Sequence, residues 1–371
     1  MVSNLPTSTS SLFLGSVPDI TYSNINGTIY IVLEVISSGS SVASLTEVYT
    51  PNINGEVILQ GLKDLLKPYI WDNIVLRCPS SASGRFKNLQ LKITATDSSG
   101  AINHDIAIYP SLGVVNESPS SYHKNFTDQK NRICYWRQPE TVALNMKLNH
   151  VLKLNYLNGN SISTITKSIS SDASDYLVLD VSATSMVRRM GLSGTKAPDA
   201  VSLVISSSYA GSVTDTIRVD YTRELKGDVV SLLHANYYGL PEVLTFHGAD
   251  RQKPRIESSF AYMNGVFRRY NYHNSIEHVT NTGYLTKERY AALNDLLVSP
   301  QVFEVSIDDE ETLVGREVTV TDLDGEFVKQ RTELRNAAIT YRYSADDYRS
   351  ADWYPTLMQR IFDYTFDYSF N

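Results

Sequence analysis

The stretch that decides the fold is TIYIVLEVI at residues 28–36, followed by SSGSS at residues 37–41. Isoleucine, valine and tyrosine recur in the first part, and β-branched and aromatic side chains fit the pleated surface of a strand. The Ser-Gly cluster that follows is typical of a turn. Similar strand-like runs occur at residues 44–49, 56–59, 88–95 and 101–109. Short strands at this spacing, with one helical turn at residues 62–69, predict an Ig-like β-sandwich over residues 1–112.

Two further β-rich blocks follow the first. Residues 113–131 are rich in Ser, Asn and Pro and lack apolar periodicity, so we expect a linker or a long loop there. Strand-like runs over residues 132–222 predict a second β-sandwich. Residues 225–345 predict a β-barrel or sheet clasped by one helix. The predicted fold class is therefore all-β (mainly β), with tandem β-sandwich domains followed by this third domain.

The clearest helical signal lies at residues 286–298. The hydroxyl of Thr286 can cap the first turn, and Pro300 ends the helix. Apolar side chains recur along one face of this helix. We expect Leu293 and Leu297 to pack onto the sheet of the third block.

Composition and charge limit the classes of function that the chain can have. The chain has 371 residues, 42% of them hydrophobic and 20% charged, which is enough apolar material for two or three globular domains. Its net charge of −7 argues against nucleic-acid binding, which needs a basic surface. No apolar run approaches the length of a membrane span, so we expect no membrane insertion. The N-terminus lacks the pattern of a signal peptide, which predicts synthesis in the cytosol without classical export.

The sequence contains two cysteines, Cys78 and Cys134. They allow at most one disulfide, and a reducing compartment is the simpler interpretation. Two thiols are too few for a disulfide framework or a zinc knuckle.

No residue constellation for catalysis or metal binding is found in the sequence. The acidic run at residues 308–311 is typical of a solvated hairpin tip. His273 and His278 are five residues apart, a spacing that suits metal ligands on neither a helix nor a strand. We therefore expect no catalytic residue, no cofactor and no metal ion, and a protein that is not an enzyme. Short basic clusters fit ordinary surface charge or docking against an acidic partner; they lie at residues 188–189, 253–255 and 268–269.

The C-terminal segment, residues 346–371, is rich in aromatic side chains. Aromatic residues alternate with small or acidic ones, which predicts a strand with one apolar face. That strand either completes its own sheet or adds to the sheet of a neighbour. We expect an assembly interface formed by Phe362, Tyr364, Phe366, Tyr368 and Phe370.

Four stretches of the third block resemble a known class of proteins; they are YYGLPEVLTFHG at 237–248, TGYLT at 282–286, LLVSPQVF at 296–303 and NAAITYRY at 336–343. The block resembles the distal-tail-like part of tail and baseplate structural proteins of phages and prophages, especially those of Bacteroidetes-like hosts. The resemblance implies a helix lying across a sheet, with the sheets of several subunits surrounding the tail channel.

This resemblance also implies a structural role rather than an enzymatic one. The chain would form a homo-oligomeric ring in a tail, tail hub or baseplate and dock other tail or baseplate proteins. It would be assembled in the host cytoplasm and would reside in the virion tail.

Two other functions compete with this one. A carbohydrate-binding or adhesive surface protein, with a role such as host attachment, would use Tyr and Trp faces against sugars. A glycan-active enzyme is a third possibility, although no predicted domain has the size of a typical catalytic barrel. A ring-forming protein is distinguished from both by a purified mass that is a multiple of the monomer mass.

Overall fold

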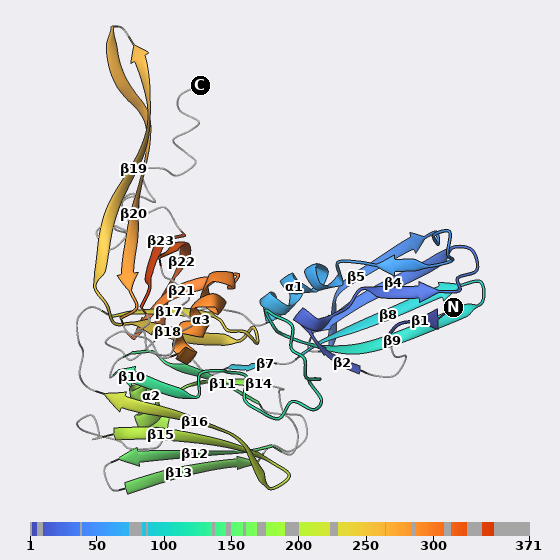
Figure 1. The fold of residues 1–371 in the computed structure, drawn as a ribbon, viewed down its shortest axis with the longest axis horizontal. Helices are drawn as coiled ribbons and strands as arrows, with labels where there is room; N and C mark the ends of the chain where they lie inside the picture. The colour runs from blue at the N-terminus through green and yellow to red at the C-terminus, as the bar shows by residue number, and fades with distance from the viewer. Residues whose placement is uncertain are drawn as a thin grey trace.

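The computed structural model describes residues 2–5, 10–37, 39–73, 84–86, 88–135, 138–145, 150–158, 161–168, 176–189, 200–222, 229–263, 265–283, 287–307, 313–324 and 336–344. The prediction of a mainly β protein is confirmed. The described strands form five sheets, grouped into three β-rich bodies (Figure 1).

The first body is a sandwich of two sheets. The smaller sheet has the strand order β1 (Val2–Ser3), β3 (Ile20–Ser23), β6 (Val57–Leu59). The larger sheet has the order β2 (Ser10–Phe13), β9 (Gly100–Tyr109), β8 (Leu89–Asp97), β4 (Ile29–Ser37), β5 (Ser40–Tyr49). β4 is the stretch that decided the fold: its residues alternate between buried and less buried, as expected for a strand with one face in the core. The short helix η1 (Leu14–Ser16) and the helix α1 (Leu62–Asn73) complete this body.

The second body also has two sheets. One has the order β10 (Asn131–Tyr135), β16 (Ser212–Thr222), β15 (Ala200–Tyr209), β12 (His150–Asn158), β13 (Ser161–Ser168). The other has the order β11 (Thr141–Asn145), β14 (Tyr176–Asp180), β7 (Gly84–Phe86). A short helix, α2 (Ala183–Arg189), follows β14. β7 precedes β8 of the first body in the chain, yet it pairs antiparallel with β14 of the second. The predicted border at residue 112 therefore does not separate all the strand pairing of the two bodies.

The third body is one open seven-stranded sheet, with no closed barrel among the described strands. Its order is β18 (Pro241–Phe246), β17 (Val230–Ala235), β21 (Val302–Ile307), β22 (Leu313–Asp324), β23 (Ala338–Tyr343), β20 (Val266–Asn281), β19 (Asp250–Met263). The helix α3 (Lys287–Val298) lies beside it (Figure 1).

The packing face of α3 differs from the one expected. Leu293 and Leu296 are buried in the same cluster as residues of β17 and β18, whereas Leu297 is 41% exposed. Residues 290, 293 and 296 are spaced by three and lie on one side, and Leu297 is turned about 100° further round the helix than Leu296. The prediction that Leu297 packs onto the sheet is therefore wrong, and Leu296 packs there instead. Thr286, the expected cap, lies outside the described residues.

The segment between the first two bodies has buried residues, mainly in its second half, where the three bodies meet. It has neither helix nor strand from residue 113 to residue 130, and its Tyr122 and Phe126 belong to the same core cluster as Ile108 and Tyr238. The Tyr122 hydroxyl donates a hydrogen bond of 2.8 Å to the Tyr238 hydroxyl. This stretch is therefore a packed loop rather than an exposed tether.

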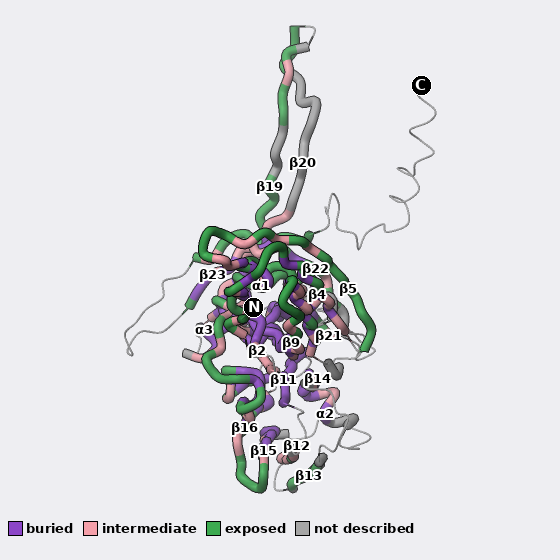
Figure 2. Tube along the Cα trace, turned by 90° about the vertical axis from the view of Figure 1, so that its right-hand side faces the viewer, coloured by how far each residue is buried: buried purple, intermediate pink, exposed green. Residues whose placement is uncertain are grey.

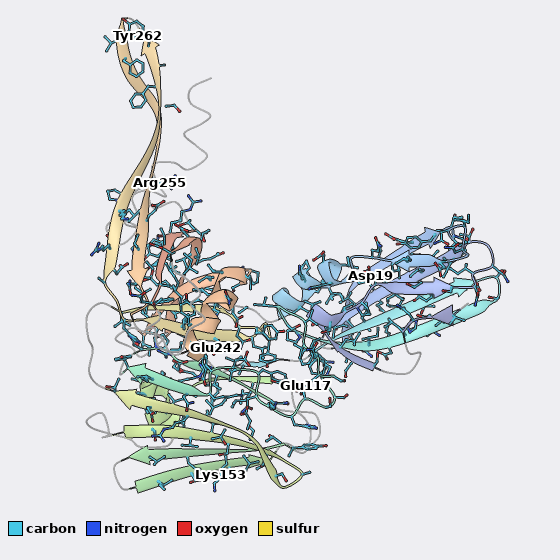
Figure 3. The ribbon with its side chains drawn as sticks, in the orientation of Figure 1. Asp19, Glu117, Lys153, Glu242, Arg255 and Tyr262 are labelled. Carbon is cyan, nitrogen blue, oxygen red and sulfur yellow. The ribbon has the colours of Figure 1, made fainter. Side chains whose placement is uncertain are left out.

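A buried ionic network joins the second body to the third. The Arg132 guanidinium donates from Nη1 to Glu140 Oε1 at 2.6 Å and from Nη2 to Glu242. Glu242 also accepts from Asn236 Nδ2 at 2.7 Å and from Thr127 Oγ1 at 3.0 Å. Figure 3 shows Glu242 at the junction of the bodies. Since the charges of Arg132, Glu140 and Glu242 are buried and paired, the network favours one relative orientation of the two bodies.

Candidate assembly surface

The hairpin of β19 and β20 extends far beyond the rest of its sheet. β19 pairs with β20 along its whole length, from Asp250 opposite Thr280 to Met263 opposite Val266. Only the last four residues of β20, 278–281, also pair with β23. The ten residues 254–263 alone span roughly 34 Å, because a strand rises about 3.4 Å per residue. The outer part of the hairpin is therefore a two-stranded ribbon that projects from the body (Figure 1).

The sequence at the far end of the ribbon suits a tight turn. Met263 pairs with Val266, and the two residues between them are Asn-Gly, the pair most favoured in two-residue hairpin turns. Gly265 has a φ of +79°, a conformation that glycine adopts without steric cost. Local sequence thus closes the hairpin without help from another element.

The root of the hairpin is held by aromatic packing. The ring of His278 stacks on Tyr341 of β23, with centroids 5.0 Å apart and an interplanar angle of 18°, and meets the edge of Tyr343. The buried Tyr341 hydroxyl donates to Glu304 at 3.3 Å, and burial raises the pKa of that phenol. His278 Nδ1 also lies 3.5 Å from Asp250 Oδ2. These contacts fix the direction in which the ribbon leaves the sheet.

Large apolar side chains are exposed to solvent at the tip of the hairpin. Tyr262 and Phe267, which face each other across the two strands, are 72% and 68% exposed. Phe260 and Phe267 stack with ring centroids 5.5 Å apart and an interplanar angle of 14°. Figure 3 places Tyr262 at the very end of the ribbon, and Figure 2 shows that the described part of this end is exposed. Aromatic side chains contribute most of the contact energy when such a surface is buried by a partner.

The charge of the hairpin is opposite to that of the remaining chain. Residues 250–281 contain five basic and three acidic side chains, a net charge of +2. Because the whole chain carries −7, the other residues together carry −9. A cross-strand ion pair joins Arg255 Nη1 to Glu277 Oε1 at 2.7 Å. It lies on the part of the hairpin nearer the body, where Figure 3 labels Arg255. The hairpin is thus a mildly basic element on an acidic protein.

The structure brings together some of the residues that the sequence singled out. The basic clusters 253–255 and 268–269 lie on the two strands of the hairpin, whereas 188–189 lies at the end of α2. His278 lies at the hairpin root and His273 further out on the same strand. The sequence did not show that only two of the described strands would form this ribbon. The charged residues 251, 253 and 255 occupy alternate positions, a pattern that predicts one solvent-facing side of a strand.

The predicted assembly residues and two further sequence features lie in parts of the chain that the structure does not describe. Phe362, Tyr364, Phe366, Tyr368 and Phe370 lie outside the described residues, as do Cys78 and the acidic run 308–311. Cys134 is a buried free thiol, and burial raises its pKa.

Neither a metal site nor a membrane-spanning helix occurs within the described ranges. No group of three or more His, Cys, Asp or Glu residues there has the arrangement of a metal site. No helix there has the length and apolar character needed to cross a bilayer.

Comparison with known proteins gives no family. No family model matches the chain, and no curated protein matches it. Among solved structures, it is similar to the tandem Ig domains A164–A165 of titin at a TM-score of 0.19 and 10% identity, over 58% of this chain and 93% of that one. It is also similar to the four N-terminal Ig domains of Dscam1 isoform 1.9 at a TM-score of 0.17 and 6% identity, over 76% of this chain and 68% of that one. Because both TM-scores are far below 0.5, neither likeness bears on function.

Proposed function

We propose that this chain is a structural subunit of a phage or prophage-derived tail, tail hub or baseplate, which oligomerises and docks other tail proteins. The observation that carries the proposal is the β19–β20 hairpin, a long ribbon with an exposed aromatic tip. A two-stranded ribbon without a third strand is marginally stable in water by itself. It gains stability when a partner covers it, so its length and its tip favour a role in contacts between subunits.

A second copy of the chain is the partner that the charges favour. The hairpin carries +2 and the remaining residues −9, so the hairpin of one copy is attracted to the body of another. Each copy then supplies one hairpin and receives one, which is the head-to-tail arrangement that closes into a ring. The tip aromatics would supply the contact area and the charges would supply the orientation.

The rest of the molecule can hold the hairpin in a fixed position on such a subunit. A hairpin can place its tip on a neighbour only if its base is held firmly, and the stack of His278 on Tyr341 holds it. The Arg132 network and the Tyr122–Tyr238 hydrogen bond tie the bodies to one another. The two sandwiches then serve as spacers or as docking faces for other tail proteins.

The proposal is tested by the mass and shape of the purified protein. The mass of the full chain is measured by light scattering over a range of concentrations, and the particles are imaged by negative-stain electron microscopy. We expect rings whose mass is a multiple of 41.5 kDa. A mass of 41.5 kDa at every concentration, both alone and with the neighbouring proteins of the same gene cluster, would contradict the proposal. Binding of the monomer to a glycan array would instead favour the carbohydrate-binding alternative.

A further inference from the structure

The first sandwich has a long, unprotected edge strand. β5 is the last strand of its sheet, ten residues long, and among the described strands only β4 pairs with it. Its sequence, SSVASLTEVY, contains no Lys, Arg or Pro and only one charged residue, Glu47. Edge strands in natural proteins are usually blocked by lysine, proline, bulges or short length, because a free edge offers its backbone groups to any other strand.

The two other long edge strands of the described sheets are protected in this way. β19 carries Arg251, Lys253, Pro254 and Arg255, and β13 carries Lys167. The only irregularity in the β4–β5 pairing lies next to the turn, where the register shifts between Val35 and Ile36. Most of the β5 edge is therefore regular and open to pairing.

The core of the first sandwich is also incompletely covered at β5. Leu45 stands opposite Leu33 of β4, whose side chain is buried, so both lie on the core face of the sheet. Ala43 and Tyr49 on the same face pack against the core cluster. Leu45, which lies between them, is nevertheless 39% exposed. A further strand beside β5 would bury it.

We propose that β5 accepts the C-terminal segment of a neighbouring copy, residues 362–370, as an additional strand. This inference rests on the proposed function, since it concerns a contact between assembled copies. The segment is nine residues long, close to the ten of β5, and its sequence alternates aromatic with polar residues as a strand with one apolar face does. Strand addition of this kind takes affinity from backbone hydrogen bonds and specificity from alternate side chains.

The charges decide which face of the added strand turns inward. Glu47 lies on the core face of β5, and Tyr49 donates a hydrogen bond to it, which raises the pKa of Tyr49 to about 12. Asp363 and Asp367 would be repelled by Glu47 if they shared its face. The aromatic rings therefore lie on the core face, where they extend the apolar rim at Leu45.

The polar residues of the added strand then take the opposite face. On β5 this face carries Ser44 and Thr46 between Val42 and Val48, and all four residues are exposed. It offers hydroxyl groups rather than carboxylates to the two aspartates.

The connecting chain is long enough to reach a neighbour. The described part of the third body ends at Ser344, and the 17 residues 345–361 precede the donated segment. An extended chain covers at most 3.3–3.6 Å per residue, so this connection spans up to about 60 Å. Donor and acceptor thus need not be on the same copy.

Cross-linking between two differently labelled full-length variants tests the contact. Both carry Cys78→Ser, and the buried Cys134 is left in place. One variant carries Thr46→Cys on β5, and the other carries Thr365→Cys on the polar face of the donated strand. They are mixed and treated with a short bis-maleimide. We expect a cross-linked product of twice the chain mass in the mixture and at least tenfold less of it in either variant alone.

The control places the first cysteine on another exposed edge strand. Thr164→Cys lies on β13, which carries Lys167, and it should give no cross-link with Thr365→Cys. The solution mass of each mixture is measured by light scattering before the reagent is added. Absence of the Thr46–Thr365 product in assembled protein would overturn this inference and leave the proposed function intact. A third variant carries Thr46→Cys and Thr365→Cys in the same chain, and a cross-link that forms only within this chain, with none between chains, would overturn the inference too. A monomeric mass without cross-linking, both alone and with the neighbouring proteins of the same gene cluster, would overturn both.

Discussion

Arg132 of β10 and Glu242 of β18 form an ion pair in which the two side chains are 0% and 3% exposed, at the place where the second and third bodies meet. The pair lies far from water, and its other hydrogen-bonding capacity is taken up by Glu140, Thr127 and Asn236. A buried pair of this kind adds little stability compared with an apolar pair of the same shape, but it is costly to leave half complete. Its evident consequence is a fixed orientation of the two bodies.

Replacement of the buried arginine should therefore destabilise the protein strongly. Arg132→Met leaves Glu242 buried without a counter-charge and leaves Glu140 with Arg289, whose Nη2 lies 3.7 Å from Glu140 Oε2, and we expect a loss of about 3–5 kcal/mol in the free energy of unfolding. Denaturant unfolding measures this loss. Arg218→Met is the matched control, because the Arg218–Asp220 pair is half-exposed and should contribute less than about 0.5 kcal/mol. Equal losses in the two variants would contradict the role given to the network.

The buried face of α3 predicts different effects for two neighbouring leucines. Leu293→Ala removes a side chain that is fully buried against the sheet and should cost about 2–5 kcal/mol. Leu297→Ala removes a side chain that is 41% exposed and should cost clearly less, about 1 kcal/mol or below. Thermal or denaturant unfolding of both variants gives the comparison. A larger loss for Leu297→Ala would show that the other face of the helix packs on the sheet.

Asp295 on α3 makes stability dependent on pH. Burial raises its pKa to about 7, with a further contribution from the nearby Glu242 charge, while its carboxylate accepts a 2.9 Å hydrogen bond from the backbone of Tyr237. A carboxyl whose folded pKa lies above its unfolded value stabilises the fold fully below the unfolded pKa, and that contribution is lost as the pH rises through about 7.

Asp295→Asn should remove this dependence, because the amide stays neutral and still accepts from Tyr237. At pH 8 we expect the variant to be more stable than the wild type by roughly 1–2 kcal/mol after allowance for the partial exposure of the group. The advantage should shrink steadily towards pH 4, which serves as an internal control. An advantage that is constant with pH would contradict the assignment to Asp295.

Deletion of the aromatic C-terminal segment, residues 361–371, should leave the two sandwiches folded but weaken assembly. Burial of its five aromatic rings supplies contact energy, so we expect the concentration for half-assembly to rise at least about tenfold, equivalent to about 1.4 kcal/mol. Far-ultraviolet circular dichroism checks the fold, and light scattering checks the assembly. An unchanged concentration for half-assembly would remove this segment from the interface.

Local sequence patterns predicted individual strands and the helix α3, because these elements depend on neighbouring residues in the chain. The alternation at residues 28–36 gave β4, and the signal at 286–298 gave α3 from Lys287 onward. Residues 255–263 and 268–274, which belong to the block predicted to be a β-barrel or sheet, both lie within the hairpin. These elements follow from side-chain periodicity and turn residues, which the sequence displays directly.

Features that depend on contacts between distant segments were missed. The pairing of Tyr176 with Phe86 joins residues 90 positions apart, and no periodicity marks it. Arg132 has its partners at positions 140 and 242, and a buried arginine looks like a surface one in a single sequence. The projection of the hairpin is missed for a related reason: a strand pattern does not tell how many neighbours the strand has.

The most direct test of the account is the solution mass of a hairpin-tip variant. Tyr262→Ser and Phe267→Ser together remove the two most exposed rings of the tip without touching the core, and Ile162→Ser with Val213→Ser removes two equally exposed apolar side chains elsewhere as the control. Light scattering should give a multiple of 41.5 kDa for the wild type and the control, and 41.5 kDa for the tip variant at the same concentration. A tip variant that keeps the wild-type mass would contradict the claim that the hairpin joins one subunit to the next.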